Sequence, residues 1–170
     1  MFKDISPNFR GYNPQHAAII DDILLYEGTP RAITRFAALE RGLDDYWYWF
    51  TLSTLWVSYS GWSDLLLWKQ LFRSSRPKRA TSIMKPSEWE AFRALPARIT
   101  AYRAHRPGET DWISYTIDRE LAERWIKQRG GHLAAYELRK KDCLALFLRR
   151  GEQEILMLEL RRARRLGEQE

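Results

Sequence analysis

Hydrophobic positions in the first half of the chain recur three or four residues apart, the spacing typical of amphipathic helices. Asn13 and Pro14 carry the signal for the start of one such helix, and Gly28 carries the signal for its end. The same arrangement of a leading proline and a trailing glycine surrounds a second helix over 31–41. We therefore predict that residues 1–96 form a helical region.

An aromatic, uncharged segment over 46–63 continues this helical pattern, with Asp44 or Asp45 at its start. It is barely long enough to cross a bilayer, and its Ser, Thr and Gly residues dilute its hydrophobicity, so a buried or half-buried helix is favoured. The tryptophans of the first half have two readings, of which packing inside a helical subdomain is favoured over a partner-binding face. They are Trp47, Trp49, Trp56, Trp62, Trp68 and Trp89.

Three further signals lie between this segment and residue 96. Ser63 is a candidate N-cap for a helix whose Leu66, Leu67, Leu71 and Phe72 face a core. The basic stretch 73–79 has no periodicity and is predicted to be a loop. Ser87 and Glu90 stand at capping-box spacing and predict one more short helix.

After Pro96 the pattern changes to short runs rich in β-branched and aromatic residues, separated by turn signals. Asp118 is a candidate N-cap for one helix over 119–129 within this part. We therefore predict an α+β fold, in which the helical region is followed by a small, mostly antiparallel β core with one helix over 97–170. The predicted strands are 98–104, 112–117, 133–138, 143–148 and 154–160.

The charge balance of the chain adds an expectation about its partners. The 170 residues contain 28 Lys and Arg against 22 Asp and Glu, a formal net charge of +6 that favours polyanionic partners. NAD, nucleic acid and acidic protein surfaces all qualify, so charge alone does not choose among them. The basic run 161–165 is read as a solvated helix face or tail in preference to a recognition element.

Cysteine and histidine usage limits the remaining chemistry. Cys143 is the only cysteine, which excludes an intramolecular disulfide and a Cys-rich metal site. His16, His105 and His132 lack the spacing of a helical zinc pair, so we predict no metal. Residues 1–7 contain no apolar stretch typical of a secretory signal, and we expect a cytoplasmic location and no membrane partner.

Three short motifs in the second half carry the candidate chemistry. They are Tyr102–Arg103 on the first predicted strand, Ser114–Thr116 on the second and Glu152–Glu154 at the entry to the last. In this order they resemble the arginine-serine-glutamate class of the ADP-ribosyltransferase superfamily, of the phage or bacterial intracellular type. Ala122 and Trp125, on the helix between them, match an Ala-x-x-aromatic pattern of that class. The resemblance is confined to the second half of the chain.

The resemblance implies NAD as the substrate and assigns roles around it. Arg103 would bind phosphate or ribose oxygens with its planar fork of donors. Ser114 would bond the nicotinamide ribose or hold the acidic residue, and Thr116 shares its face of the strand. Glu154 would stabilise the positive charge that builds on the ribose as the glycosidic bond breaks.

Two aromatic residues of the motifs complete the predicted NAD contacts. Tyr102 precedes the arginine on its strand. Trp125 has two readings, as a core residue or as a wall of the nicotinamide pocket. His105 is likewise read as a surface residue or as an adenosine contact.

Glu152 carries the prediction about the acceptor. An acceptor arginine is protonated in water and needs a neighbouring base, which Glu152 would supply. We therefore expect a mono-ADP-ribosyltransferase that modifies a macromolecule, with an arginine of a host protein favoured. The alternatives are an NAD glycohydrolase, a nucleic-acid ADP-ribosyltransferase, and a non-catalytic basic module that binds nucleic acid or protein.

A further alternative is that the motif residues have no catalytic role. In it, Arg103 pairs with Glu109 or Asp111 on a surface, Ser114 is an ordinary strand residue, and the two acids of Glu152–Glu154 are solvated turn residues.

Overall fold

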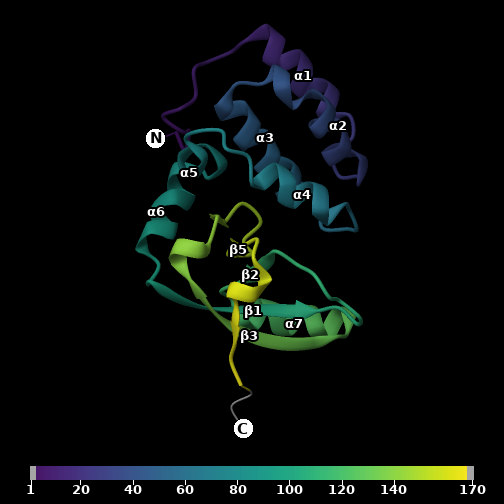
Figure 1. Cartoon of the computed structure of the whole chain (residues 1–170), viewed down its shortest axis with the longest axis vertical. Helices are drawn as coiled ribbons and strands as arrows, with labels where there is room; N and C mark the ends of the chain where they lie inside the picture. Colours follow the sequence, from purple (N-terminus) through teal and green to yellow (C-terminus); the bar gives the residue numbers. More distant parts are fainter. Residues whose placement is uncertain (1–2, 168–170) are drawn as a thin grey trace. The chain divides into compact units, whose positions relative to one another are not determined.

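The computed structural model describes residues 3–167 and has an α+β fold. Its residues divide into two compact units, a helical unit (Met1–Ser87) and a sheet unit (Glu88–Glu170), which are described separately below. Figure 1 shows helices along the first part of the chain and strands along the second. The predicted fold class is therefore confirmed.

Among its described residues the helical unit has five α-helices, of which α1, α3 and α4 begin at a side-chain N-cap. The Asn13 side chain accepts hydrogen bonds from the amides of Gln15 and His16, and Asp44 accepts one from Trp47. These bonds satisfy amide groups that have no partner within the first turn of a helix, which is why the helices begin there. The helices are α1 (Pro14–Leu24), α2 (Arg31–Leu39), α3 (Asp45–Ser58), α4 (Leu65–Phe72) and α5 (Arg79–Ile83).

Aromatic side chains fill the core of the helical unit. Trp49 of α3 is fully buried, and the rings of Phe36 and Tyr48 lie 5.2 Å apart. Trp68 is also buried, whereas Trp62 is 78% exposed, so the packing reading holds for only some of the tryptophans. Among residues 3–167, no helix combines the length and the apolar character needed to cross a membrane.

Two predictions for the helical unit are wrong. The N-cap of α4 is Asp64, and the Ser63 hydroxyl instead accepts a hydrogen bond of 2.9 Å from the Trp68 indole. Of the residues predicted to face a core, Leu66 is 70% exposed, whereas Phe72 is fully buried. The predicted loop over 73–79 ends one residue early, because α5 begins at Arg79.

The sheet unit is built on six strands in the order β4-β5-β2-β1-β3-β6, and every pair of neighbours is antiparallel. The long strands β1 and β3 pair over eight residues, and α7 lies alongside them (Figure 1). The strands are β1 (Arg98–His105), β2 (Ser114–Thr116), β3 (His132–Arg139), β4 (Ala145–Phe147), β5 (Glu154–Leu156) and β6 (Arg164–Arg165). The helices are α6 (Pro86–Ala94) and α7 (Arg119–Arg129).

One face of the sheet carries the core of this unit. Ala101 of β1, Tyr115 of β2 and Tyr136 of β3 are buried together there, as alternation along the strands requires. Phe92 of α6 and Leu95 pack against the same cluster. The two compact units divide between Ser87 and Glu88, within the first turn of α6, whereas the prediction placed the division after residue 96.

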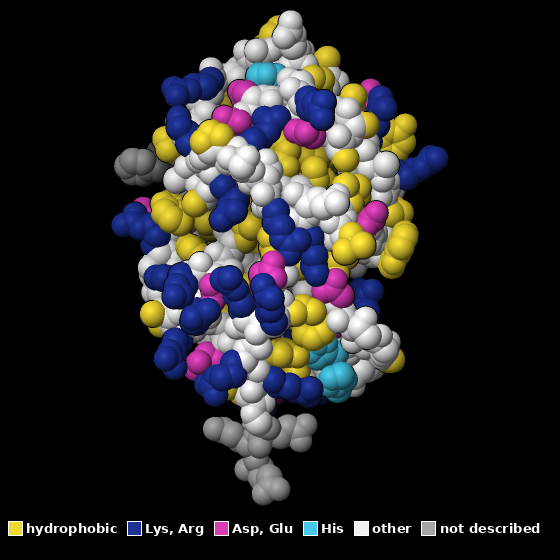
Figure 2. Space-filling view, viewed as in Figure 1, with side chains coloured by type: hydrophobic (Ala, Val, Ile, Leu, Met, Phe, Trp, Pro, Cys, Tyr) yellow, Lys and Arg dark blue, Asp and Glu magenta, His cyan; other side chains and the backbone are white. Residues whose placement is uncertain are grey.

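The arginines of the basic run 161–165 are exposed, as predicted, but the run is neither a helix face nor a tail without secondary structure. It forms a 3₁₀ turn (Leu160–Arg162) and then β6, which pairs with β3. Arg162 binds Asp142 at 2.7 Å, and Arg164 binds Glu137 at 3.1 Å. Figure 2 shows acidic side chains among the basic ones on the visible face, which agrees with this pairing.

Candidate active site

Arg103 lies on β1 and is held by three hydrogen bonds. Its Nε donates to Glu109 Oε2 at 3.2 Å, its Nη2 donates to Glu109 Oε1, and its Nη1 donates to the Ser114 carbonyl at 3.2 Å. This pairing of Arg103 with Glu109 is the one expected if the motifs have no catalytic role. It is not a solvated surface pair, however, because the Arg103 and Glu109 side chains are only 24% and 12% exposed.

The turn after β1 brings Glu109 back beside Arg103. The Glu109 amide donates to the Arg106 carbonyl at 3.1 Å, and Gly108 has a φ of 73°, which glycine adopts without strain. Sequence analysis missed Glu109 as part of a site. The available signal was its position four residues after His105, at the end of a Pro-Gly turn.

His105 holds the other side of the Glu109 carboxylate. Its Nδ1 lies 2.8 Å from Glu109 Oε2, and its Nε2 lies 2.6 Å from the Tyr136 hydroxyl. With a neutral imidazole, Nδ1 donates to Glu109 and Nε2 accepts from Tyr136. His105 is only 3% exposed, so its reading as a surface residue is wrong. We call Tyr136, His105, Glu109 and Arg103 the buried relay.

Electrostatics agree with this arrangement of protons. Burial is the main cause that lowers the pKa of His105, which keeps its imidazole neutral. Burial acts to raise the pKa of Glu109, but the hydrogen bond and charge of Arg103, helped by His105, outweigh it and lower that pKa. The relay therefore holds an ionised carboxylate between a guanidinium and a neutral histidine.

Ser114 connects Arg103 to Glu154. Its hydroxyl donates to Glu154 Oε2 at 2.5 Å, while its carbonyl accepts from Arg103. The contact follows from the pairing of β2 with β5, which sets Thr116 opposite Glu154 and Ser114 opposite Leu156. Arg103, Ser114 and Glu154, the three residues of the predicted signature, thus lie on neighbouring strands, but the Arg103 side chain is on the opposite face of the sheet from the other two.

The two contacts of Ser114 reach it from different faces of the sheet. Arg103 alternates with Tyr102 and leaves β1 on the core face of Ala101, whereas the Ser114 side chain is on the face opposite Tyr115. The Arg103 guanidinium therefore donates a hydrogen bond to the Ser114 carbonyl on one face, and the Ser114 hydroxyl donates one to Glu154 on the other.

Arg129, at the end of α7, lies near groups from both faces. Partial burial is the largest cause that lowers the pKa of its guanidinium, and the charge of Arg103 lowers it further. Glu152 and Glu109 act in the opposite direction on the same group.

Thr116 supports the loop that carries Glu152. The Thr116 side chain is buried, its hydroxyl donates to the Glu152 carbonyl at 2.6 Å, and it accepts from the Asp118 amide at 3.0 Å. The Thr116 hydroxyl thus both donates and accepts a hydrogen bond within the fold. A contact of Thr116 with NAD stays a prediction.

The Glu152 carboxylate binds a neighbour in sequence. Arg150 Nη2 lies 3.3 Å from Glu152 Oε1, with the two side chains 39% and 23% exposed. The carboxylate at the predicted acceptor position therefore already holds a guanidinium. Sequence analysis did not single out Arg150.

The two predicted aromatic contacts are both half-buried. The Arg129 guanidinium lies 5.1 Å from the centre of the Trp125 ring, and the Arg119 guanidinium lies 6.0 Å from that of Tyr102. Trp125 is thus not a fully buried core residue. Its role as a wall of a nicotinamide pocket stays a prediction.

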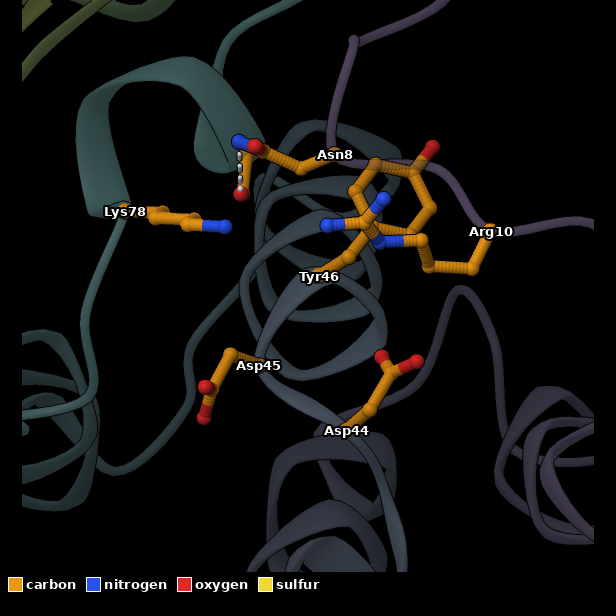
Figure 3. A pocket seen from close by; sticks show the side chains of 7 residues that line it. Asn8, Arg10, Asp44, Asp45, Tyr46 and Lys78 are labelled. Carbon is orange, nitrogen blue, oxygen red and sulfur yellow. Dashed lines mark hydrogen bonds between the residues drawn. The ribbon is translucent and has the colours of Figure 1, made fainter.

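A separate pocket of about 160 Å³ lies within the helical unit. Figure 3 shows Arg10 and Lys78 on one side of it and Asp44 and Asp45 on the other. None of the residues of the predicted signature lines this pocket, and its opposite charges offset each other. It adds nothing to the site on the sheet.

Comparison with protein-family models, with curated proteins and with solved structures finds no match for this chain.

Proposed function

We propose that the chain is a mono-ADP-ribosyltransferase that transfers ADP-ribose from NAD to a macromolecule, with an arginine of a host protein as the favoured acceptor. The observation that supports it most is the hydrogen bond between the Ser114 hydroxyl and Glu154, together with the Arg103 contact on the Ser114 carbonyl. In this proposal the Ser114 hydroxyl and the Glu154 carboxylate act together on one face of the sheet, while Arg103, on the opposite face, contacts the backbone carbonyl of Ser114.

Glu154 stabilises the transition state in this proposal. Breaking the bond between nicotinamide and ribose places positive charge on the ribose, and a fixed carboxylate beside it lowers the barrier. The hydrogen bond donated by the Ser114 hydroxyl helps to hold the Glu154 carboxylate in place, because it restricts the rotamers of that side chain. Catalysis by charge stabilisation depends on such prior orientation of the charged group.

Arg103 orients the substrate in this proposal. A guanidinium carries five N–H donors. Within the described chain, three of them are engaged by Glu109 and Ser114, which leaves one hydrogen on each terminal nitrogen for a phosphate or ribose oxygen. The permanent positive charge of arginine suits the pyrophosphate of NAD.

Glu152 meets the acceptor. Its carboxylate lies 3.3 Å from the guanidinium of Arg150, a contact that supports placing an arginine side chain at this position. As a base it would accept the proton that an attacking guanidinium must lose. We propose that this reaction takes place in the cytoplasm of a bacterial or phage-infected host cell, where the chain acts as a toxin or host modifier.

Incubation with labelled NAD and a bacterial lysate tests the proposal. Label in protein is the expected result. Label in nucleic acid would indicate a different acceptor, and label only in free ADP-ribose would indicate a glycohydrolase. If no NAD is consumed, the proposal fails and a non-catalytic binding module becomes the better reading.

A pair of matched variants tests the site itself. Glu154→Gln keeps the size of the side chain but removes its charge, and we expect turnover to fall by about 10²–10³-fold. Glu120→Gln makes the same change at an exposed position of α7 and is expected to retain full activity. A fully active Glu154→Gln protein would show that the carboxylate is not catalytic.

A further inference from the structure

The carboxylate proposed to meet the acceptor is paired with an arginine of the same chain. Arg150 Nη2 lies 3.3 Å from Glu152 Oε1, and the Arg150 side chain is 39% exposed. Half-exposed ion pairs of this kind are weak, so the guanidinium is held near the carboxylate without being locked there. Arg150 is thus accessible and stands beside the base that an acceptor arginine needs.

The backbone fixes where this pair stands. The Glu152 carbonyl accepts from the buried Thr116 hydroxyl at 2.6 Å, and the Gln153 carbonyl accepts from the Ile117 amide at 3.2 Å. Gln153 has a φ of 44°, a conformation that a residue other than glycine adopts only where its surroundings impose it. The loop therefore has a defined shape, and it leads directly into Glu154 at the start of β5.

The neighbouring arginine provides a contrast. Arg149 lies 3.1 Å from Glu88 Oε1, and the two side chains are 11% and 1% exposed. Its guanidinium is also 5.3 Å from the centre of the Phe147 ring. Arg149 is thus part of the packing of the sheet unit, whereas Arg150 is more exposed and pairs with Glu152.

We propose that Arg150 is an acceptor in cis, so that each chain ADP-ribosylates its own Arg150; this inference rests on the proposed function. The bond between ribose C1′ and the nicotinamide nitrogen breaks, and its electron pair leaves with neutral nicotinamide. A lone pair of an Arg150 terminal nitrogen forms the new bond to C1′. The proton lost by that nitrogen passes to Glu152 and then to water, so the product remains a guanidinium.

The experiment incubates the purified full chain with NAD and locates modified residues by peptide mass spectrometry. The expected result is one ADP-ribosyl group on Arg150 and none on Arg149. Arg150→Lys is expected to lose the modification, whereas Arg161→Lys, a change at a side chain that is 82% exposed, is expected to keep it. Thermal unfolding of each variant shows whether it is folded.

A second variant tests the role of Glu152 separately from the presence of the arginine. Glu152→Gln is expected to reduce labelling of Arg150 by about tenfold or more relative to NAD consumption, since a general base contributes at least that much. Equal labelling in Glu152→Gln and wild type would overturn the role of the ion pair.

Mixing wild-type and inactive chains tests whether each chain modifies its own Arg150. Wild-type chain is incubated with NAD and Glu154→Gln chain, and the inactive chain is expected to stay unmodified at Arg150. Modification of the inactive chain at the wild-type rate would overturn the reaction in cis. If NAD is consumed and other proteins are labelled while Arg150 stays unmodified, this inference fails and the proposed function stands. If no NAD is consumed, both fail.

Discussion

Both oxygens of the Glu109 carboxylate contact the Arg103 guanidinium, through Nε and through Nη2. His105 holds the same carboxylate at 2.8 Å, so the orientation of the arginine depends on a residue behind it and not on its own strand alone. Charge-assisted pairs with two parallel hydrogen bonds fix geometry more strongly than a single contact does. This arrangement makes the affinity for an anionic substrate sensitive to residues that never touch it.

Glu109→Gln should therefore weaken NAD binding more than it slows the chemical step. The amide cannot accept on both sides from Arg103, so the fork loses its fixed orientation. We expect KM for NAD to rise about tenfold, which corresponds to about 1.4 kcal/mol, with kcat changed by less than about threefold. Steady-state kinetics across a range of NAD concentrations measure both quantities.

Glu123→Gln is the matched control for this prediction. Glu123 pairs with Arg119 at 2.8 Å on the exposed surface of α7, and the loss of such a pair has little effect. A fall in kcat with unchanged KM in Glu109→Gln would contradict the positioning role.

Acid should destabilise the chain through His105. Its pKa lies below the ordinary 6.5, mainly because of burial. As pH falls through about 6.5, the unfolded chain takes up a proton at this residue while the folded chain does not, so stability decreases. The lowered pKa of Glu109 adds a second loss as pH falls below its ordinary 4.5, since its carboxylate is bound to Arg103.

Urea unfolding at a series of pH values between about 8 and 4 measures this effect. His105→Gln removes the titrating group and should flatten the upper part of the profile. A wild-type stability that does not change between about pH 7 and pH 5 would contradict the buried, neutral state of His105.

Ser114→Ala should lower kcat by about tenfold or more, because a hydrogen bond to a charged group contributes about 1.5–3 kcal/mol. Glu154 would keep its charge but lose the hydrogen bond from the Ser114 hydroxyl. KM should change little, since Arg103 contacts only the backbone carbonyl of Ser114. Thr100→Ala removes a hydroxyl from an exposed position of β1 and serves as the control. An unchanged kcat in Ser114→Ala would show that the hydroxyl has no catalytic role.

Glu88→Ala should destabilise the sheet unit by about 3–5 kcal/mol, the cost of breaking a buried ion pair. Glu88 is 1% exposed, accepts from the Leu148 amide at 2.7 Å and binds Arg149, so its removal leaves a buried cation and amide without their partner. Glu90→Ala, on the exposed face of α6, should change stability by less than about 0.5 kcal/mol. Equal denaturation midpoints for the two variants would contradict this role of Glu88.

Helix starts could be predicted from the sequence because capping is local. Asn13, Asp44 and Asp118 each bond amides two or three residues ahead, so the information lies within one turn of chain. Local sequence did not decide whether Ser63 or Asp64 is the N-cap of α4. Both residues can cap a helix, and a contact of Ser63 with the indole of Trp68 accompanies the start at Leu65.

The basic run 161–165 was misread because its partners lie far away in the sequence. Arg164 binds Glu137 and Arg162 binds Asp142, and the pairing with β3 gives the segment its extended form. Seen alone, five residues with four arginines have the composition of a solvated tail. Strand pairing across such a distance leaves no local periodicity to detect.

The sequence by itself determined the α+β class, most helix boundaries and the residue types of the signature, because these depend on periodicity, capping and short motifs. Only the tertiary structure decided that Ser114 meets Glu154, forty residues apart, and that Glu109 and His105 fix Arg103 from behind. A hydrogen bond between side chains requires placement to within a fraction of an ångström. Such placement comes from strand register and turn geometry, which the packing of the whole sheet unit sets.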